Sequence, residues 1–235
     1  MPGFRKRSVS KYIRLFAAAF CACSLLAGPA IPARAAAPSA AELLLEANRA
    51  LPIQSDEIPG WPAGPVIGAE SAILMEARTG AILYSKNIHM REYPASTTKI
   101  LTALIAAERC QMDEIVTFSH DAVYDTPWDS SHIAMDVGQE LTMEQCLNAI
   151  LIRSANEVCY AVAEHLTSTT DWQVFSGIMN DRAAQLGCLY THFVNPNGLP
   201  DDDHYTTAYD LAMIGRAFFA NEMLCKITLS PRIDF

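Results

Sequence analysis

The spacing of hydrophobic positions predicts β-strands early in the globular part of the chain and α-helices in the rest of it. Two short apolar runs, residues 72–76 and 81–85, flank a segment that ends in Gly80. Two such runs around a glycine-containing turn are typical of a β-hairpin. A further short apolar run at residues 115–118 predicts a third strand. The remaining segments show no clear strand pattern, so the fold is expected to be largely helical.

Apolar residues downstream of the hairpin recur every three or four positions, which is the spacing of an amphipathic helix. Several of these segments carry end signals. Thr142 and Gln145 form a capping box, Thr170 and Thr207 occupy N-cap positions, and Gly187 fits a C-terminal cap. Helices are therefore predicted near residues 96–109, 120–124 (capped by Ser119), 142–153, 157–166, 170–187 and, as the last one, 207–218.

Ser96 and Lys99 stand three residues apart at the head of an apolar run rich in Ala, Leu and Ile. Pro94 disfavours helix just before them, so the helix is expected to open at Ala95 or Ser96. Residues three apart share one helix face, which brings the amine to the hydroxyl. Burial lowers the pKa of a lysine and lets it act as a base toward a nucleophile. The same spacing also fits a helix cap with a solvent-exposed lysine, so the motif alone leaves both interpretations open.

Ser154 and Asn156 lie in a short break between two predicted helices. From such a break both side chains can line a cleft. There Ser154 would relay a proton between Lys99 and a leaving amine, and Asn156 would hydrogen-bond Lys99 or a substrate amide. Serine and asparagine are also common at helix ends, and that structural role remains the alternative.

Residues 1–35 differ from the rest of the chain in the order of their charged, apolar and small residues. A basic start precedes a short apolar run, and small residues follow it, with cleavage expected after Ala35 or Ala37. This pattern is typical of a secretory signal peptide. The alternative is a membrane anchor, but the apolar run is short for a span of about 20 residues. Residues 36–68, rich in Ala and Pro with a helical patch at 40–49, are expected to form an irregular arm, and residues 69–235 the main domain.

The net charge of residues 36–235 limits what they can bind, and their cysteine content limits the disulfides that they can form. Residues 36–235 hold 11 basic and 26 acidic side chains, a formal charge of −15. Such an acidic protein is not suited to nucleic acid and is repelled by an anionic membrane surface. Five cysteines remain in this part, and an odd number argues against a complete disulfide framework. Buried free thiols are expected, although a single bridge stays open.

The order Ser-x-x-Lys and then Ser-x-Asn, with the residues around both motifs, resembles the serine D-alanyl-D-alanine carboxypeptidases. These enzymes are the low-molecular-mass penicillin-binding proteins of peptidase family S11. The resemblance covers about residues 70–225 and implies an α/β (α+β) fold of the DD-peptidase/β-lactamase type. The segments that carry it are residues 79–87, 94–99, 151–157, 193–199 and 204–211.

The resemblance implies a reaction and gives roles to the four candidate residues. Ser96 would attack the carbonyl between two terminal D-alanines of a peptidoglycan stem peptide, and Lys99 would take its proton. Ser154 would relay the proton, and Asn156 would bind substrate. The Ser96 backbone N–H would give half of an oxyanion hole. Penicillins and other β-lactam antibiotics would acylate the same serine, and no cofactor or metal ion is implied.

One family motif is missing from the sequence. The family's third motif, Lys-Thr-Gly, lies on a strand along the far wall of the cleft, and this sequence does not contain it. We therefore expect residues 69–235 to be an incomplete catalytic domain that lacks the C-terminal strands of the sheet and the membrane anchor. Its activity is expected to be feeble. Rapid hydrolysis of D-Ala-D-Ala peptides by residues 36–235 would contradict this expectation.

Three other functions remain open at this stage. A β-lactamase would need a deacylating carboxylate after the Ser-x-Asn motif, and Glu157 and Glu164 lie on the adjacent helix instead. A non-catalytic penicillin- or peptidoglycan-binding protein and an endopeptidase are the other two. The six histidines of the chain show no metal-ligand spacing and are expected to be structural or on the surface. Residues 201–203 are expected to be a solvated loop, and Trp128 is expected to edge the cleft.

Overall fold

The computed structural model describes residues 37–230, and the chain divides into two compact units, residues 1–43 and 44–235. In the first unit the start of helix α2 (Ala40–Arg49) is described, and this helix matches the predicted patch. Glu42 N donates to Ser39 Oγ, and Ser39 N donates to a Glu42 carboxylate oxygen. The predicted signal peptide, residues 1–35, lies outside the described residues, so it stays a prediction.

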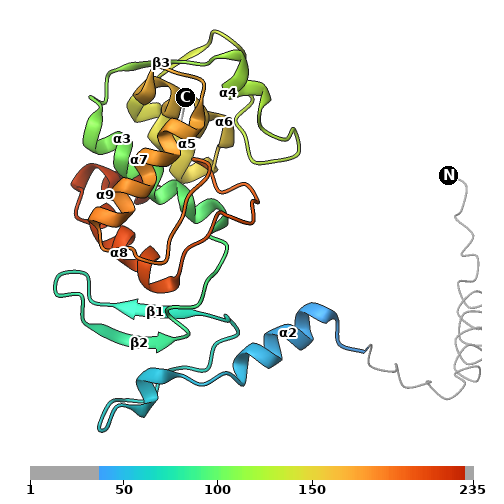
Figure 1. Ribbon diagram of the computed structural model, residues 1–235, viewed down its shortest axis with the longest axis vertical. Coiled ribbons are helices and arrows are strands. Elements are labelled where there is room, and N and C mark those ends of the chain that lie inside the picture. The colour runs from blue at the N-terminus through green and yellow to red at the C-terminus, as the bar shows by residue number, and fades with distance from the viewer. Residues whose placement is uncertain (1–36, 231–235) are drawn as a thin grey trace, which may run out of the picture. The chain divides into compact units, whose positions relative to one another are not determined.

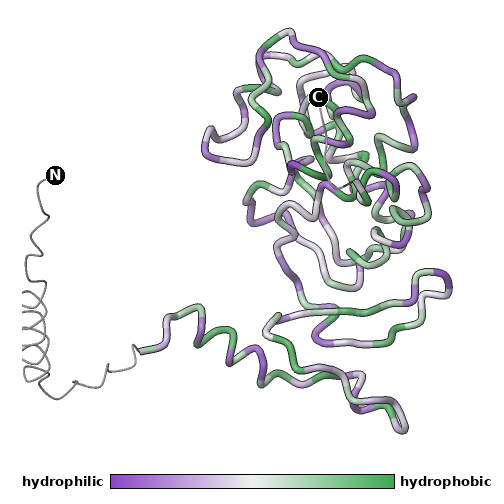
Figure 2. Tube along the Cα trace, turned by 180° about the vertical axis from the view of Figure 1, so that it is seen from behind, coloured by the Kyte–Doolittle hydropathy of each residue, from purple (hydrophilic) through white to green (hydrophobic). Residues whose placement is uncertain are grey.

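The predicted hairpin is present. Strands β1 (Ala72–Met75) and β2 (Ile82–Lys86) pair antiparallel as a two-stranded sheet (Figures 1 and 2), in which β1 is hydrophobic throughout and β2 begins with two hydrophobic residues. The segment before the hairpin includes a short 3₁₀-helix, η1 (Gln54–Glu57), and is otherwise irregular. It packs on β2 through side-chain to backbone hydrogen bonds. Tyr84 donates to the carbonyl of Pro65, and Trp61 donates to the carbonyl of Leu83.

Lys86 connects this segment to the hairpin. Its side chain is only 1 % exposed, and its Nζ donates to the carbonyls of Asn48 at 2.6 Å and Ile67 at 2.9 Å. Backbone carbonyls that are buried without a donor are costly, so this lysine satisfies groups that the irregular segment cannot pair by itself.

Replacing Lys86 with methionine keeps much of the side-chain volume and removes the donor. The two carbonyls then lose their partner, and the free energy of unfolding should fall by about 1–3 kcal/mol. Urea denaturation measures the change. The exposed Lys226 gives a matched control, and Lys226→Met should change stability by less than about 0.5 kcal/mol. Equal effects of the two variants would contradict the bridging role.

The rest of the unit is a helical body around α3 (Lys99–Arg109), which contacts α5 through α9. Its side chains from Leu101 to Ala106 are buried, which explains why this run is mostly apolar. The surrounding helices are α5 (Met143–Arg153), α6 (Asn156–Thr167), α7 (Trp172–Gln185), α8 (Ala208–Phe219) and α9 (Glu222–Thr228), and hydrophobic residues concentrate among them (Figures 1 and 2). Within residues 37–230, each helix is too short or too polar to cross a membrane.

Local capping signals predict most helix starts correctly. Thr142 and Gln145 exchange both bonds of the capping box at α5, and Ser119 accepts from Ala122 N at α4 (His120–Tyr124). Thr207 accepts from Asp210 N at α8, and Gly187 follows α7 with φ +85°. The five cysteines at positions 110, 146, 159, 188 and 225 are unpaired thiols, and all but the last are buried, as expected.

Four features of the fold differ from the predictions. Helix α3 begins at Lys99 rather than Ser96, because a 3₁₀-turn, η2 (Ala95–Thr98), precedes it. Asp171, not Thr170, caps α7 by accepting from Gln173 N. Helix α9 follows α8, with Asn221 as its cap. A strand not predicted, β4 (Glu140–Thr142), pairs antiparallel with the predicted strand β3 (Ile115–Thr117).

Candidate active site

The structure brings Ser96 and Lys99 into contact at the junction of η2 and α3. Lys99 Nζ lies 3.0 Å from Ser96 Oγ. Ser96 is exposed, whereas Lys99 is only 2 % exposed. The nucleophile candidate is therefore open to a ligand, while the base candidate is shielded from water behind it.

The surroundings of Lys99 favour its neutral form. Burial is the main cause that lowers the pKa of its ammonium group, and charged Glu157 and Cys159 would oppose this. Cys159 does not carry that charge, because burial raises the pKa of its own thiol to about 12. Lys99 Nζ also donates to the carbonyl oxygen of Asn197 at 2.7 Å. A neutral amine that gives one N–H to Asn197 keeps its lone pair for the Ser96 hydroxyl proton.

The segment from Phe193 to Pro200 holds the Asn197 carbonyl in place. Asn195 Oδ1 accepts from the backbone N–H of Asn197 and Gly198, and its Nδ2 donates to the carbonyl of Leu199. Thr102, one turn along α3 from Lys99, donates to the carbonyl of Pro196 at 2.6 Å. The turn is thus bonded both to itself and to the helix that carries the lysine.

Gly198 lets this segment lie directly against the nucleophile turn. Its φ is +87°, and a Cβ at this position would lie 1.8 Å from the carbonyl oxygen of Ala95. Only glycine fits such an approach without displacing backbone. The contact fixes the residue that immediately precedes Ser96.

His204 provides a second link beneath the nucleophile turn. Its Nδ1 accepts from Val194 N–H at 3.1 Å, so the ring proton sits on Nε2, which donates to Thr98 Oγ1 at 2.8 Å. Burial is the main cause that lowers its pKa to about 4. The imidazole is therefore neutral at ordinary pH and acts as a structural bridge.

Ser154 and Asn156 lie at the junction of α5 and α6, two helices that both pack against α3. Ser154 is half-buried in the left-handed region with φ +55°, and Asn156 is buried with its backbone N–H donating to the carbonyl of Ser131. Among the described residues, neither side chain makes a hydrogen bond to Lys99. Their assigned roles remain predictions.

A pocket of about 340 Å³ lies beside the nucleophile turn. Its lining includes Pro94 and Ala95 from the start of the turn, together with Gly198 and His204. Residues 201–203 are exposed, as expected for a solvated loop, and Asp201 and Asp202 border the pocket. Trp128, which is 88 % exposed, instead lines a separate pocket of about 190 Å³ with Glu157.

Sequence reasoning gave no role to Asn197, Gly198 or His204, although all three lie in segments that carry the family resemblance. The turn-forming sequence Asn-Pro-Asn-Gly at 195–198 is the only local signal for them. It predicts a tight turn, but not that the turn would face Lys99.

Known proteins match most of this chain. The family model for D-alanyl-D-alanine carboxypeptidase, peptidase S11, matches residues 60–231. The carboxypeptidase DacF of Bacillus subtilis is 36 % identical over 166 residues, which is 68 % of this chain and 41 % of that protein. DacA of Escherichia coli K12 is 32 % identical over 66 % of this chain and 40 % of its own length. The chain thus spans less than half the length of these relatives.

Solved structures of similar proteins share the fold of this chain. The crystal structure of the carboxypeptidase DacD from Francisella tularensis has a TM-score of 0.66 at 32 % identity, over 71 % of this chain and 41 % of that one. Penicillin-binding protein 6B from Escherichia coli has a TM-score of 0.65 at 31 % identity, over 71 % of this chain and 55 % of that one. The predicted DD-peptidase-like fold is confirmed. The chain belongs to the peptidase S11 family of D-alanyl-D-alanine carboxypeptidases.

Proposed function

We propose that this chain is a serine acyltransferase of cell-wall metabolism that removes the terminal D-alanine from peptidoglycan stem peptides and is acylated by penicillins. The observation that carries the proposal is the contact between the exposed Ser96 hydroxyl and the shielded Lys99 amine, which is also bonded to the Asn197 carbonyl. A nucleophile beside a base of lowered pKa is the arrangement that covalent catalysis requires. The relatives' printed name, D-alanyl-D-alanine carboxypeptidase, supports the choice of substrate.

The first half of the proposed reaction forms an acyl-enzyme. Neutral Lys99 takes the Ser96 proton as Oγ attacks the carbonyl carbon of the bond between the two D-alanines. The backbone N–H of Ser96, in the first turn of η2, faces the oxyanion, since such groups lack a partner within the helix. The proton then passes from Lys99 through Ser154 to the leaving amine, and D-alanine departs. Asn156 holds the peptide in register.

The second half releases the product. Water attacks the Ser96 ester as Lys99 takes a proton from it. Lys99 returns this proton to Ser96 Oγ when the ester bond breaks, and the shortened peptide leaves as its carboxylic acid. A β-lactam ring meets the same nucleophile, and opening its amide bond yields an ester at Ser96. The pocket of about 340 Å³ lined by Pro94, Ala95 and Gly198 lies next to the turn that carries Ser96, and we assign it to the residues that flank the scissile bond.

We place this activity outside the cytoplasmic membrane, where peptidoglycan lies. The basic start, the apolar run and the small residues of segment 1–35 support export by a signal peptide. The acidic composition of the rest supports a peptide partner rather than nucleic acid.

Labelling with a fluorescent penicillin tests the proposal. Each chain has to react only once, so labelling detects even slow acylation. We expect a stable covalent label that peptide mass spectrometry places on Ser96 and that Ser96→Ala abolishes. Ser168→Ala, an exposed serine at the far end of α6, is the matched control and should label normally. A label that is rapidly released would indicate a β-lactamase, and a folded chain that takes no label would overturn the proposal.

A further inference from the structure

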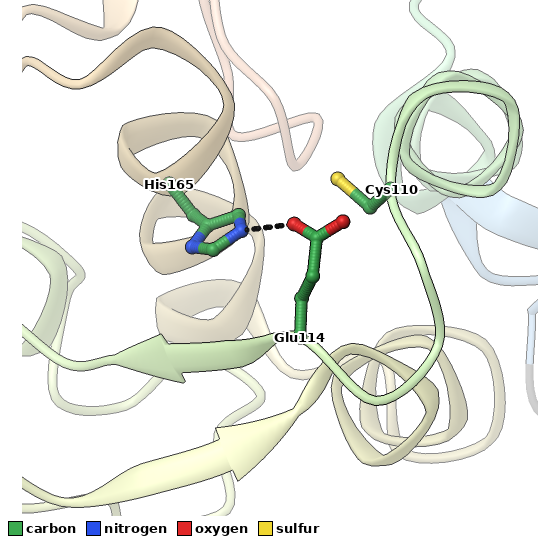
Figure 3. A group of neighbouring side chains, drawn as sticks. All are labelled: Cys110, Glu114 and His165. Carbon is green, nitrogen blue, oxygen red and sulfur yellow. Dashed lines mark hydrogen bonds and ion pairs between the residues drawn. The ribbon is translucent and has the colours of Figure 1, made fainter.

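Three side chains with metal-binding atoms lie close together at the C-terminal end of α3, whereas Ser96 lies just before its N-terminal end. Cys110 follows the end of α3, Glu114 immediately precedes β3, and His165 lies near the end of α6 (Figure 3). One ligand atom from each lies within 4.8 Å of the others. The imidazole Nε2 of His165 is 2.8 Å from Glu114 Oε2.

This cluster is separate from the candidate active site. Lys99 begins α3 and Cys110 follows its last residue, and an α-helix of 11 residues is about 16 Å long. The proposed reaction uses none of the three side chains. Cys110 and Glu114 are close in the sequence, but His165 is 51 positions from Glu114, so only the fold brings it to the other two.

A backbone hydrogen bond holds one of the three side chains, that of Glu114, in place. Cys110 N donates to the carbonyl of Ala106 at 3.0 Å, which fixes the backbone at the end of α3 but not the thiol. The Glu114 carboxylate accepts from Gln111 N–H at 2.6 Å through Oε1, which leaves Oε2 for His165. Such outer hydrogen bonds are what orients the ligands of metal sites in proteins.

The donor atoms of the cluster are of three kinds and converge on one point. The thiol sulfur, a carboxylate oxygen and an imidazole nitrogen lie within 4.8 Å of one another. Cys159, Cys188 and Cys225 each donate their thiol to a backbone carbonyl, whereas Cys110 and Cys146 donate to no acceptor among the described residues. Of these two, Cys110 alone belongs to the cluster.

We propose that Cys110, Glu114 and His165 form a three-ligand site for Zn²⁺, with water as the fourth ligand. Sulfur, imidazole nitrogen and carboxylate oxygen are the donors that zinc takes in proteins, at about 2.0–2.3 Å. Small rotations of the three side chains close the present spacing around one ion. Metal binding releases the thiol proton to the solvent, the neutral imidazole carries its one proton on Nδ1 so that Nε2 binds the ion, and the 2+ charge balances one thiolate and one carboxylate. The bound ion ties together the ends of α3 and α6 and the start of β3.

Cobalt provides a spectroscopic test of the proposed site. The full chain, stripped with a chelator under reducing conditions, is titrated with Zn²⁺ by calorimetry and with Co²⁺ by absorption. A Cys21→Ser, Cys23→Ser background removes the two thiols of segment 1–35. We expect one ion per chain, with the near-ultraviolet charge-transfer absorption of a cobalt–thiolate bond. Cys110→Ser should remove this absorption. His165→Gln and Glu114→Gln should each weaken binding by more than the roughly 10- to 100-fold loss seen for outer-shell partners.

Two matched controls use groups of similar chemistry elsewhere. His120 lies 3.4 Å from Asp121 on the surface without a cysteine nearby, and Cys225 is the most exposed of the five described thiols. Neither His120→Gln nor Cys225→Ser should change the affinity or the stoichiometry. Circular dichroism of the metal-free variants verifies that each is folded. Absence of binding by the folded parent chain, or an unchanged cobalt–thiolate band in Cys110→Ser, would overturn the proposal and leave a His165–Glu114 ion pair beside a thiol. Neither readout involves Ser96, so this site and the proposed function can fail independently.

Discussion

Lys99→Ala should lower the rate of Ser96 acylation by a penicillin by about 10²- to 10⁴-fold, the usual contribution of a general base. The variant removes the only amine within hydrogen-bond distance of Ser96 Oγ among residues 37–230. Stopped-flow or gel-based labelling measures the rate. Lys226→Ala, which removes an exposed amine, should label at the parental rate.

The pH profile separates loss of a base from loss of structure. Burial lowers the pKa of Lys99, so the neutral amine forms at a lower pH than in an ordinary lysine. The acylation rate should therefore rise with pH and level off below the usual pKa of a lysine. Lys99→Arg keeps the positive charge but does not deprotonate in this range, so it should be slow and without this rise. A fast Lys99→Arg variant with the parental pH profile would contradict the assignment of Lys99 as the base.

Among substitutions that add one methyl group near the site, Gly198→Ala should cause the largest loss of stability and of Ser96 labelling rate. The new Cβ would lie 1.8 Å from Ala95 O and 2.3 Å from Ala95 C, both backbone atoms that cannot rotate away. The left-handed backbone adds about 1–2 kcal/mol for a residue with a side chain. The free energy of unfolding should drop by about 3 kcal/mol or more, and Ser96 should label more slowly because the turn before it is displaced.

Gly138→Ala is the matched control for this prediction. Gly138 has φ +83°, but a Cβ there would meet no atom within 4 Å. This variant should lose only the backbone contribution of about 1–2 kcal/mol and should label Ser96 normally. Denaturant unfolding and labelling rates compare the two. If the two variants are equally stable and equally reactive, the close approach of Gly198 to Ala95 does not position the nucleophile.

Features encoded by neighbouring residues were predictable from the sequence. The hairpin, the capping box of Thr142 and Gln145 and the cap at Thr207 depend on residues within one or two turns of each other. The contact between Ser96 and Lys99 belongs to the same class, since one turn of helix produces it. Local rules therefore gave the candidate nucleophile and base.

Features that depend on competing or distant partners were not predictable. Thr170 and Asp171 are both good cap residues, and the local turn geometry selects the aspartate. Strand β4 has three residues and owes its existence to pairing with β3. At the site, Lys99 meets Asn197, 98 positions away, and Thr98 meets His204, 106 positions away. The periodicity of hydrophobic residues carries no information on contacts between residues so far apart in the sequence.

The backbone carbonyl of Asn197, and not its side chain, accepts the hydrogen bond from Lys99. Because the backbone supplies the acceptor for Lys99, the contact is encoded in the shape of the turn at residues 195–199 and not in the identity of residue 197. An alanine scan would report the side chain of Asn197 and miss its carbonyl. Changes at Asn195, which never touches Lys99 directly, would alter the base by moving that carbonyl.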